Sequence, residues 1–263
     1  IFFFVFASIV FLLPTGLISA ELCKQLPSEG GVYHWAKKAF GDSYAMLVVW
    51  LQWVNTMIFF PTCLTALAGT LAYLIEPSLA KKPVFLVCIS LGAFWIMTFV
   101  NLKGIKQSAK ITSVTTIVGM VIPMILIISL SLLWIILGKP LAVHITKAAV
   151  LPNLADKSTW VSLTAIITAF LGMELAAVHV KKIKNSDKVF PKALVVSIII
   201  IILTMGVGSL GVSLIVPHKD IMLVSGTIQA FHTIFAGFHV LWLSSVIGVM
   251  LLFASLGTMV NWL

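Results

Sequence analysis

Seven apolar stretches dominate this sequence, and each is long enough to cross a lipid bilayer as an α-helix. A helix needs about 20 apolar residues to span a hydrocarbon core of ~30 Å. The stretches cover about residues 1–20, 44–76, 83–100, 111–138, 159–180, 190–216 and 236–263. A helix also satisfies its own backbone polar groups, which lipid cannot do. The pattern predicts an all-α, polytopic transmembrane helix bundle with about seven spans, forming one transmembrane domain over residues 1–263.

The amino-acid composition indicates an integral membrane protein. Hydrophobic residues make up 60% of the 263 residues and charged residues only 10%. A soluble surface needs more charge than this. No stretch has the alternating pattern of a barrel strand, so the spans are predicted to be helical. The chain starts and stops within apolar stretches, and we expect it to be a fragment of a longer protein, incomplete at both ends.

The 17 basic residues, all lysines, predict how the spans are oriented. Eleven lie in the loops 21–43, 101–110 and 181–192, which share one side of the membrane, and six lie on the other side. The positive-inside rule places the lysine-rich side in the cytoplasm. This role accounts for the net charge of +9 without a nucleic-acid partner. We therefore expect a multi-pass protein of the cell's inner (plasma) membrane.

The side chains that usually carry catalysis or bind metal are sparse. Cys23, Cys63 and Cys88 have no paired spacing and are predicted to be free thiols. No phosphate-binding glycine loop, metal-ligand cluster or catalytic triad spacing is visible. The sequence therefore predicts no metal, no cofactor and no enzymatic activity.

The string PSEGGVYHW, residues 27–35, follows the first span. Gly30 and Gly31 permit a turn that other residues resist. Val32, Tyr33 and Trp35 then predict an amphipathic segment lying on the membrane surface. The alternative is a polar linker that contains two aromatic residues by chance.

Two other sets of residues predict packing and membrane depth. Trp134 and Trp160 flank the loop 139–158 and are interpreted as interfacial anchors, with interior packing as the alternative. Gly206, Gly208 and Gly211 in the sixth stretch predict close contact between helices.

The fifth stretch contains an acid at membrane depth. Glu174 lies about 15 residues into the stretch, a rise of roughly 22 Å along a helix, which places it in the cytoplasmic half of the bilayer. An ionised carboxylate there costs several kcal/mol unless it is paired or hydrated. Because a glycine costs about 1 kcal/mol in a helix interior, Phe170, Leu171 and Gly172 mark where the helix could open.

Opening the helix there would free backbone N–H and C=O groups, which must then face a cavity or a ligand. The ends of the two half-helices carry partial charges that suit the carboxylate and ammonium groups of a zwitterion. The alternative for Glu174 is a buried acid that pairs with a neighbouring helix or reaches the membrane surface.

Several strings resemble the amino acid–polyamine–organocation superfamily of transporters. They are PTGLISAEL (14–22), PSEGGVYHW (27–35), NLKGIKQSAKI (101–111), AFLGMELAAVHV (169–180) and the PKA at 191–193. The likeness covers nearly the whole chain and is greatest to the bacterial glutamate/γ-aminobutyrate antiporters. It implies a twelve-helix fold with two inverted repeats of five helices. The seven spans would be family helices two to eight, and the broken first helix would lie outside this sequence.

The resemblance also implies roles for individual residues. It assigns substrate binding to Ala169, Phe170, Leu171, Gly172, Phe60, Thr258 and Trp262. The first four match the unwound segment whose backbone meets the substrate, and Thr258 and Trp262 lie in SLGTMVNWL (255–263). Glu174 matches a gating and proton-sensing glutamate. Thr258 stands where the glutamate/γ-aminobutyrate antiporters carry an acid, which is a departure from their pattern.

The implied activity is secondary active transport by alternating access. The expected reaction exchanges an amino acid for its decarboxylated amine, which supports acid resistance. Proton-coupled amino acid symport on the same fold is one alternative, and a non-transporting membrane scaffold or sensor is another. The expected partners are an amino acid or amine substrate, the lipid bilayer and a second copy of the protein in a homodimer, with no nucleic acid.

Overall fold

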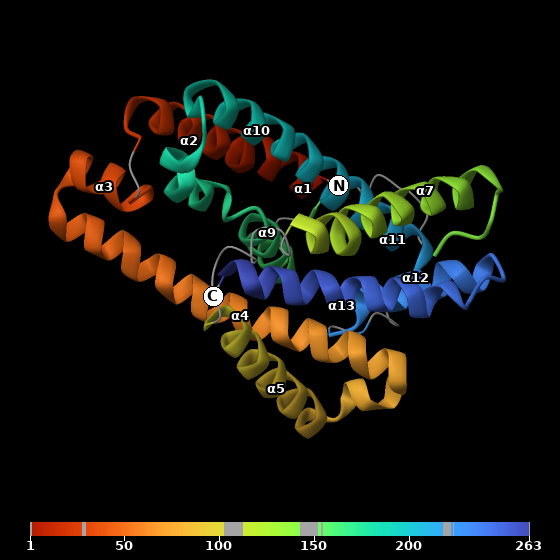
Figure 1. The fold of residues 1–263 in the computed structure, drawn as a ribbon. Coiled ribbons are helices and arrows are strands. Elements are labelled where there is room, and N and C mark those ends of the chain that lie inside the picture. The colour runs from red at the N-terminus through yellow and green to blue at the C-terminus, as the bar shows by residue number, and fades with distance from the viewer. Residues whose placement is uncertain are drawn as a thin grey trace. The chain divides into compact units, whose positions relative to one another are not determined.

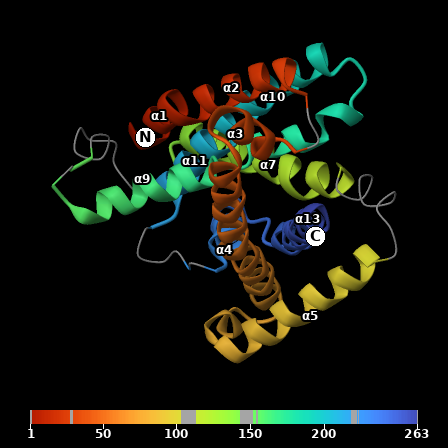
Figure 2. The same cartoon turned by 90° about the vertical axis from the view of Figure 1, so that its left-hand side faces the viewer.

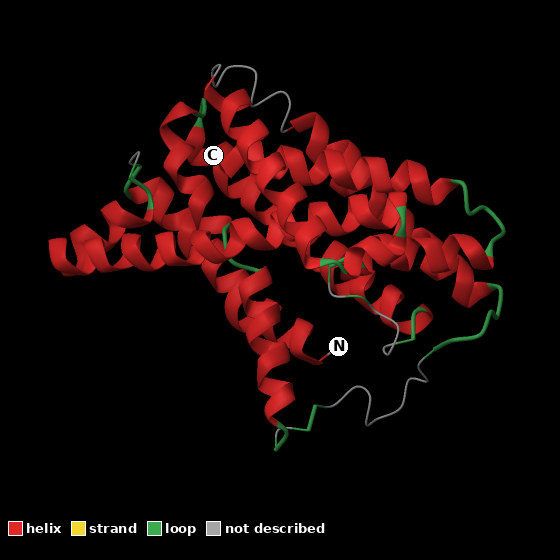
Figure 3. Cartoon of the chain, turned by 90° about the horizontal axis from the view of Figure 1, so that it is seen from below, coloured by secondary structure: helices red, strands yellow, loops and turns green. Residues whose placement is uncertain are grey.

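The computed structural model of the chain consists of helices joined by loops (Figure 1). It describes residues 2–27, 30–102, 113–142, 152–153, 155–217, 222 and 224–262. Within these residues there is no β-strand (Figure 3). The predicted all-α class is therefore confirmed.

The chain divides into two compact units, and each is described by itself. Unit 1 comprises Ile1–Asn55 and His144–Ser209, and unit 2 comprises Thr56–Val143 and Leu210–Leu263. Unit 1 contains α1 (Phe2–Ala7), η1 (Ser8–Leu12), α2 (Leu13–Gln25), α3 (Val32–Phe40), the first part of α4 (Asp42–Ile75), α9 (Lys157–Ala169), η4 (Met173–Lys182), α10 (Ser186–Ile201) and η5 (Ile202–Val207). Unit 2 contains the rest of α4, η2 (Pro77–Lys81), α5 (Pro83–Leu102), η3 (Ile117–Val121), α7 (Ile122–Ile136), most of α11 (Gly208–Ile215), α12 (Gly226–Gly237) and α13 (Leu243–Trp262).

In unit 1, α2 and α10 lie side by side (Figures 1 and 2). A Cβ atom added at Gly16 would lie 2.6 Å from Cδ1 of Ile198. The missing side chain therefore lets the two helices approach closely. The buried core of unit 1 also takes side chains from α3, η4 and the residue after α9; it includes Leu12, Cys23, Trp35, Phe170, Met173, Ala177, Val180, Phe190, Leu194 and Ile198.

In unit 2, the short helix α12 packs against α7 and α13. Its apolar face is almost wholly inaccessible to solvent and includes Ile228, Ala230, Phe231, Ile234 and Phe235. The helix α13 also packs closely on η3, because a Cβ atom at Gly119 would lie 2.5 Å from the carbonyl oxygen of Met250. Small residues thus set the helix spacing in both units.

Six helical stretches of the described chain are long and apolar enough to cross a membrane. They are Phe2–Gln25, Asp42–Ile75, Pro83–Leu102, Ser113–Ile136, Thr159–Val178 and Lys188–Ile215. These match six of the predicted spans. The seventh, expected over 236–263, is shorter, with an apolar helix over Leu243–Met259. The predicted start was wrong because α12 ends at Gly237 and a turn with His239 at φ 59° precedes α13.

The segment after Gly31 is a helix, α3, as its amphipathic pattern predicts. Gly30 and Gly31 form the turn before it, and Gly31 has a φ of +47°. Trp35 is buried in the core of unit 1, and its indole Nε1–H donates to the carbonyl oxygen of Leu26 at 3.4 Å. Trp35 on the apolar face of α3 therefore packs within the protein. The sequence pattern predicts contact of this face with the membrane surface and does not indicate the packing.

Two other predictions need correction. Trp134 is only 7% exposed and packs in the core of unit 2, so the interior alternative holds and the interfacial interpretation was wrong. Trp160 is exposed, and its place at the membrane interface stays a prediction. Gly211 does permit close contact, since its added Cβ would lie 2.5 Å from Oγ of Ser131, but no atom lies within 4 Å of the same position at Gly206.

Candidate functional site

The fifth span is interrupted where Gly172 lies. The α-helix α9 ends at Ala169, residues 170–172 form a turn, and the chain continues as the 3-10 helix η4. Gly172 has φ 111° and ψ −9°, a left-handed conformation that glycine adopts without the steric cost of a Cβ atom. The predicted opening of the helix at Phe170, Leu171 and Gly172 is confirmed as a feature of the backbone.

Tight backbone hydrogen bonds close both sides of the interruption. The N–H of Phe170 donates to the carbonyl of Ile167 at 3.0 Å, and the N–H of Leu171 donates to that of Thr168 at 3.3 Å. On the other side, the N–H of Leu175 donates to the carbonyl of Gly172 at 3.2 Å. The α-helical ladder is thus replaced by 3-10 turns, in which the N–H of residue i+3 donates to the carbonyl of residue i and which are common where a helix ends.

Glu174 satisfies the N–H group at the centre of the interruption. The N–H of Gly172 donates to Oε1 of Glu174 at 3.2 Å and to Oε2 at 3.1 Å. A carboxylate at the start of a helix also interacts favourably with the partial positive charge there. The alternatives from the sequence were a partner on a neighbouring helix and a reach to the membrane surface. The half-buried Glu174 side chain instead accepts a hydrogen bond from the backbone of its own segment.

The carbonyl groups of the interruption differ from the Gly172 N–H in their hydrogen bonding. No group in the described part of the chain donates a hydrogen bond to the carbonyl oxygen of Phe170 or Leu171. A carbonyl without a donor is costly in an apolar environment. These two oxygens can therefore accept hydrogen bonds from a ligand, whereas the Gly172 N–H is already occupied.

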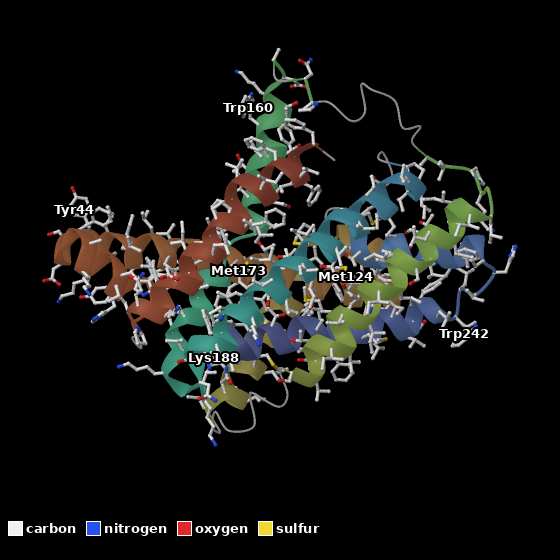
Figure 4. All side chains as sticks on the ribbon, turned by 90° about the horizontal axis from the view of Figure 1, so that it is seen from above. Tyr44, Met124, Trp160, Met173, Lys188 and Trp242 are labelled. Carbon is white, nitrogen blue, oxygen red and sulfur yellow. The ribbon has the colours of Figure 1, made fainter. Side chains whose placement is uncertain are left out.

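The side chains around the interruption point in different directions. Phe170 is 2% exposed and makes an edge-to-face contact with Phe4, with ring centroids 6.4 Å apart. Met173 is buried in the same core, at the start of η4 (Figure 4). Ala169 and Leu171 are exposed, Leu171 by 42%. Phe170 therefore anchors the segment by its side chain, and the segment can offer mainly its backbone and these two exposed residues to a ligand.

The remaining predicted site residues belong to unit 2. Phe60 is half-buried near the middle of α4, next to Pro61. Thr258 is half-buried in α13, and its Oγ1–H donates to the carbonyl of Ala254 at 2.9 Å. Trp262 ends α13, and its side chain lies outside the described residues. The structure thus brings together Ala169, Phe170, Leu171, Gly172 and Glu174 in unit 1, and Phe60, Thr258 and Trp262 stand in unit 2.

Sequence reasoning missed two π-helical segments of unit 1 whose residues share a core cluster with Phe170. They are η1 in the first span and η5 in the span that follows η4. Both contact α1, which itself packs along α9. π-Helical turns are rare and are frequent at functional sites. A π-turn has no distinct spacing of apolar residues, so the sequence contained no signal that could have found them.

Comparison with known proteins places the chain in a family. Its sequence matches the amino acid permease family over residues 1–263. The chain belongs to the amino acid permease family. Membership agrees with the apolar spans and with the interruption at Gly172, and it confirms the superfamily resemblance that the sequence motifs indicated.

Three relatives of this permease show the range of related activities. An uncharacterised transporter of Legionella pneumophila is 34% identical over 263 residues, which is 100% of this chain and 56% of that protein. A glutamate/gamma-aminobutyrate antiporter of Lactococcus lactis is 29% identical over 100% of this chain and 53% of its own length. A probable agmatine/putrescine antiporter of the same species is 27% identical over 99% and 55%. The chain spans about half the length of these relatives.

Proposed function

We propose that the permease containing this chain is a secondary active transporter that exchanges an amino acid for its decarboxylated amine. The observation that carries the proposal is the interruption at Gly172, where no donor among the described residues reaches the carbonyl oxygens of Phe170 and Leu171. An ammonium group supplies N–H donors to such oxygens. The names of two relatives, a glutamate/gamma-aminobutyrate antiporter and an agmatine/putrescine antiporter, support exchange of amino acids or amines.

Roles in substrate binding are proposed for residues of each unit separately. Ala169, Phe170, Leu171 and Gly172 would contact the substrate mainly through their backbone. In unit 2, Phe60, Thr258 and Trp262 are also proposed to contact substrate, and alternating access would proceed by movement of one group of helices against another. A threonine in place of an acid at Thr258 would affect how the site responds to substrate charge.

Glu174 would govern gating and its response to protons, because its carboxylate holds the Gly172 N–H. Protonation would weaken that hydrogen bond and so loosen the interruption. In a cell, exchange of an acid for its amine consumes cytoplasmic protons when decarboxylation follows uptake. The proposed physiological role is therefore acid resistance at the inner (plasma) membrane.

The test uses the full-length protein in proteoliposomes. Uptake of labelled glutamate, γ-aminobutyrate or putrescine is measured, each in turn, into vesicles that contain glutamate, γ-aminobutyrate, putrescine or no substrate. We expect uptake only with a matching substrate inside, because the binding site of an exchanger crosses back through the membrane only with a substrate bound. Uptake into empty vesicles driven by a pH gradient would instead establish the proton-coupled symporter, and no uptake of any amino acid or amine under any condition would support a non-transporting role.

The same vesicles test Glu174. The Glu174→Gln variant keeps an oxygen acceptor for the Gly172 N–H but cannot ionise. We expect its exchange rate to lose the pH dependence of the wild type. An unchanged rate and an unchanged pH profile would remove the proposed proton-sensing role while leaving the exchange reaction itself in place.

A further inference from the structure

A strongly basic surface lies at one end of unit 1, and the transport site does not use it. It is called the basic end here and consists of seven exposed lysines from α2, α3, η4, the loop after η4 and α10: Lys24, Lys37, Lys38, Lys181, Lys184, Lys188 and Lys192. Figure 4 labels Lys188 near the start of α10, where other side chains also end in nitrogen atoms.

Packing brings these lysines together from distant parts of the sequence. The helices α2 and α10 cross where Gly16 meets Ile198. From that crossing, α2 runs forward to Lys24 and α10 runs back to Lys188, and the core residues Cys23 and Phe190 pack in the same cluster. The last turn of α2 and the first turn of α10 therefore lie at the same end of the unit.

Helices α3 and η4 join the same end. A Cβ atom at Gly31 would lie 3.1 Å from Cγ2 of Val178 and 3.7 Å from Cβ of Ala177. This contact sets the turn before α3 beside the second half of η4, whose last residues include Lys181. Because these helices end where the apolar spans end, the lysines lie at the level of the membrane–water interface.

Among the described side chains, one acid forms an ion pair with a lysine of the basic end. Among the described residues, the one ion pair at the basic end joins Nζ of Lys37 to Oδ1 of Asp42 at 2.6 Å. This hydrogen bond raises the pKa of Lys37. The carboxylate of Glu21 instead accepts from Nε2 of Gln25 at 2.7 Å. The other six lysines have no carboxylate within ion-pair distance among the side chains that the structure describes.

Aromatic side chains flank the basic end. Phe40 is 71% exposed and Tyr44 is 60% exposed, and their ring centroids lie 6.1 Å apart across the junction of α3 and α4. Exposed aromatic side chains at the end of a span are typical of the head-group region of a bilayer. A lipid can contact both groups, because its phosphate interacts with the lysines while its apolar part covers the two rings. A soluble anion would leave the two rings in water.

We infer that the basic end of unit 1 binds the head groups of anionic phospholipids in the cytoplasmic leaflet. Juxtamembrane lysines gain about 1 kcal/mol each from an anionic membrane surface. The ligand class is a phosphodiester with an acyl chain, which can meet the lysines and the exposed rings at once. This inference does not depend on which substrate the permease transports.

The experiment measures lipid binding by the full-length protein. Purified protein is placed in nanodiscs of phosphatidylcholine alone or of an equal mixture with phosphatidylglycerol, and its thermal midpoint is recorded. Retained phosphatidylglycerol is counted by native mass spectrometry. The test variant carries Lys24→Gln, Lys184→Gln, Lys188→Gln and Lys192→Gln. The control carries Lys81→Gln, Lys82→Gln and Lys157→Gln, three exposed lysines outside the basic end, so losses are compared per removed lysine.

We expect phosphatidylglycerol to raise the thermal midpoint of the wild type and of the control, and to raise that of the test variant much less. Each removed lysine should weaken phosphatidylglycerol binding about fivefold, and added salt should weaken it in the wild type. A variant with arginine at the same four positions should retain binding, which separates lost charge from misfolding. If it does not retain binding while folding normally, the charge argument fails.

Two results would overturn the inference. Equal losses in the test and control variants would mean that phosphatidylglycerol responds to total charge and not to the basic end. If inorganic phosphate in phosphatidylcholine nanodiscs produced the same stabilisation, the surface would be a site for free anions and not for lipid. If the four-fold variant does not fold, the single variant Lys192→Gln, compared with Lys157→Gln, decides the same question.

Discussion

The backbone N–H of Gly172 donates to both carboxylate oxygens of Glu174, two residues further along the chain. The side chain of Glu174 therefore closes back on the one residue of the turn that has a left-handed conformation. In an apolar span, an N–H without a partner would cost several kcal/mol. The glycine makes the interruption of the helix possible, and the glutamate makes it stable without a ligand.

The left-handed conformation of Gly172 predicts the effect of a single methyl group. Gly172→Ala should lower the free energy of unfolding by about 1–2 kcal/mol, because alanine rarely adopts φ 111°. No atom lies within 4 Å of the added Cβ, so the cost comes from the backbone and not from a clash. Thermal unfolding of the purified full-length protein measures it.

Gly206→Ala is the matched control. Its added Cβ also meets no atom within 4 Å, but its φ is not positive. The control should leave the thermal midpoint unchanged or raise it slightly. Equal destabilisation by both substitutions would mean that the left-handed conformation of Gly172 does not cause the loss of stability.

The hydrogen bond from Gly172 predicts that Glu174 stabilises the fold separately from any role in gating. Glu174→Ala leaves the Gly172 N–H without its acceptor and should lower the free energy of unfolding by about 1–3 kcal/mol. Glu174→Gln keeps a carbonyl oxygen at the same place and should cost less. Both are measured by thermal unfolding without substrate; if Gln destabilises as much as Ala, the hydrogen bond does not stabilise the interruption.

A third prediction concerns the end of α12 in unit 2. Nζ of Lys139 donates to the carbonyl oxygen of Gly237 at 2.5 Å and lies 4.9 Å from the ring centroid of Phe238 and 5.2 Å from that of Trp134. A cation at the end of a helix and over two rings is favourable. Lys139→Met should therefore lower the free energy of unfolding by about 1–2 kcal/mol.

Hydrogen exchange locates the effect of Lys139→Met. Exchange should become faster for the last turn of α12, where the lost bond held Gly237, and less so for unit 1. The exposed Lys157 offers a control, because Lys157→Met removes a lysine from α9 without removing such contacts. The same acceleration in both variants would contradict a local role for Lys139.

Much of the fold could be predicted from local sequence alone. The length of each apolar stretch determines whether a helix can span the bilayer, and six of the seven predicted spans match. The interruption could also be predicted, because Gly172 permits a conformation that its neighbours resist and Glu174 needs a partner at that depth. The turn at Gly30 and Gly31 follows from the same freedom of glycine.

Tertiary structure alone decided which side chains those helices bury. Trp134 is a core residue because α12 covers it, and Trp35 is buried because α3 packs on unit 1. The start of α13 and the two π-helical segments of unit 1 also had no local signal. The physical reason is that an apolar or aromatic residue gains similar free energy from lipid, interface or protein interior, so the sequence around it is the same. Only contacts between segments distant in the chain, such as those that gather the lysines of the basic end, select among these environments.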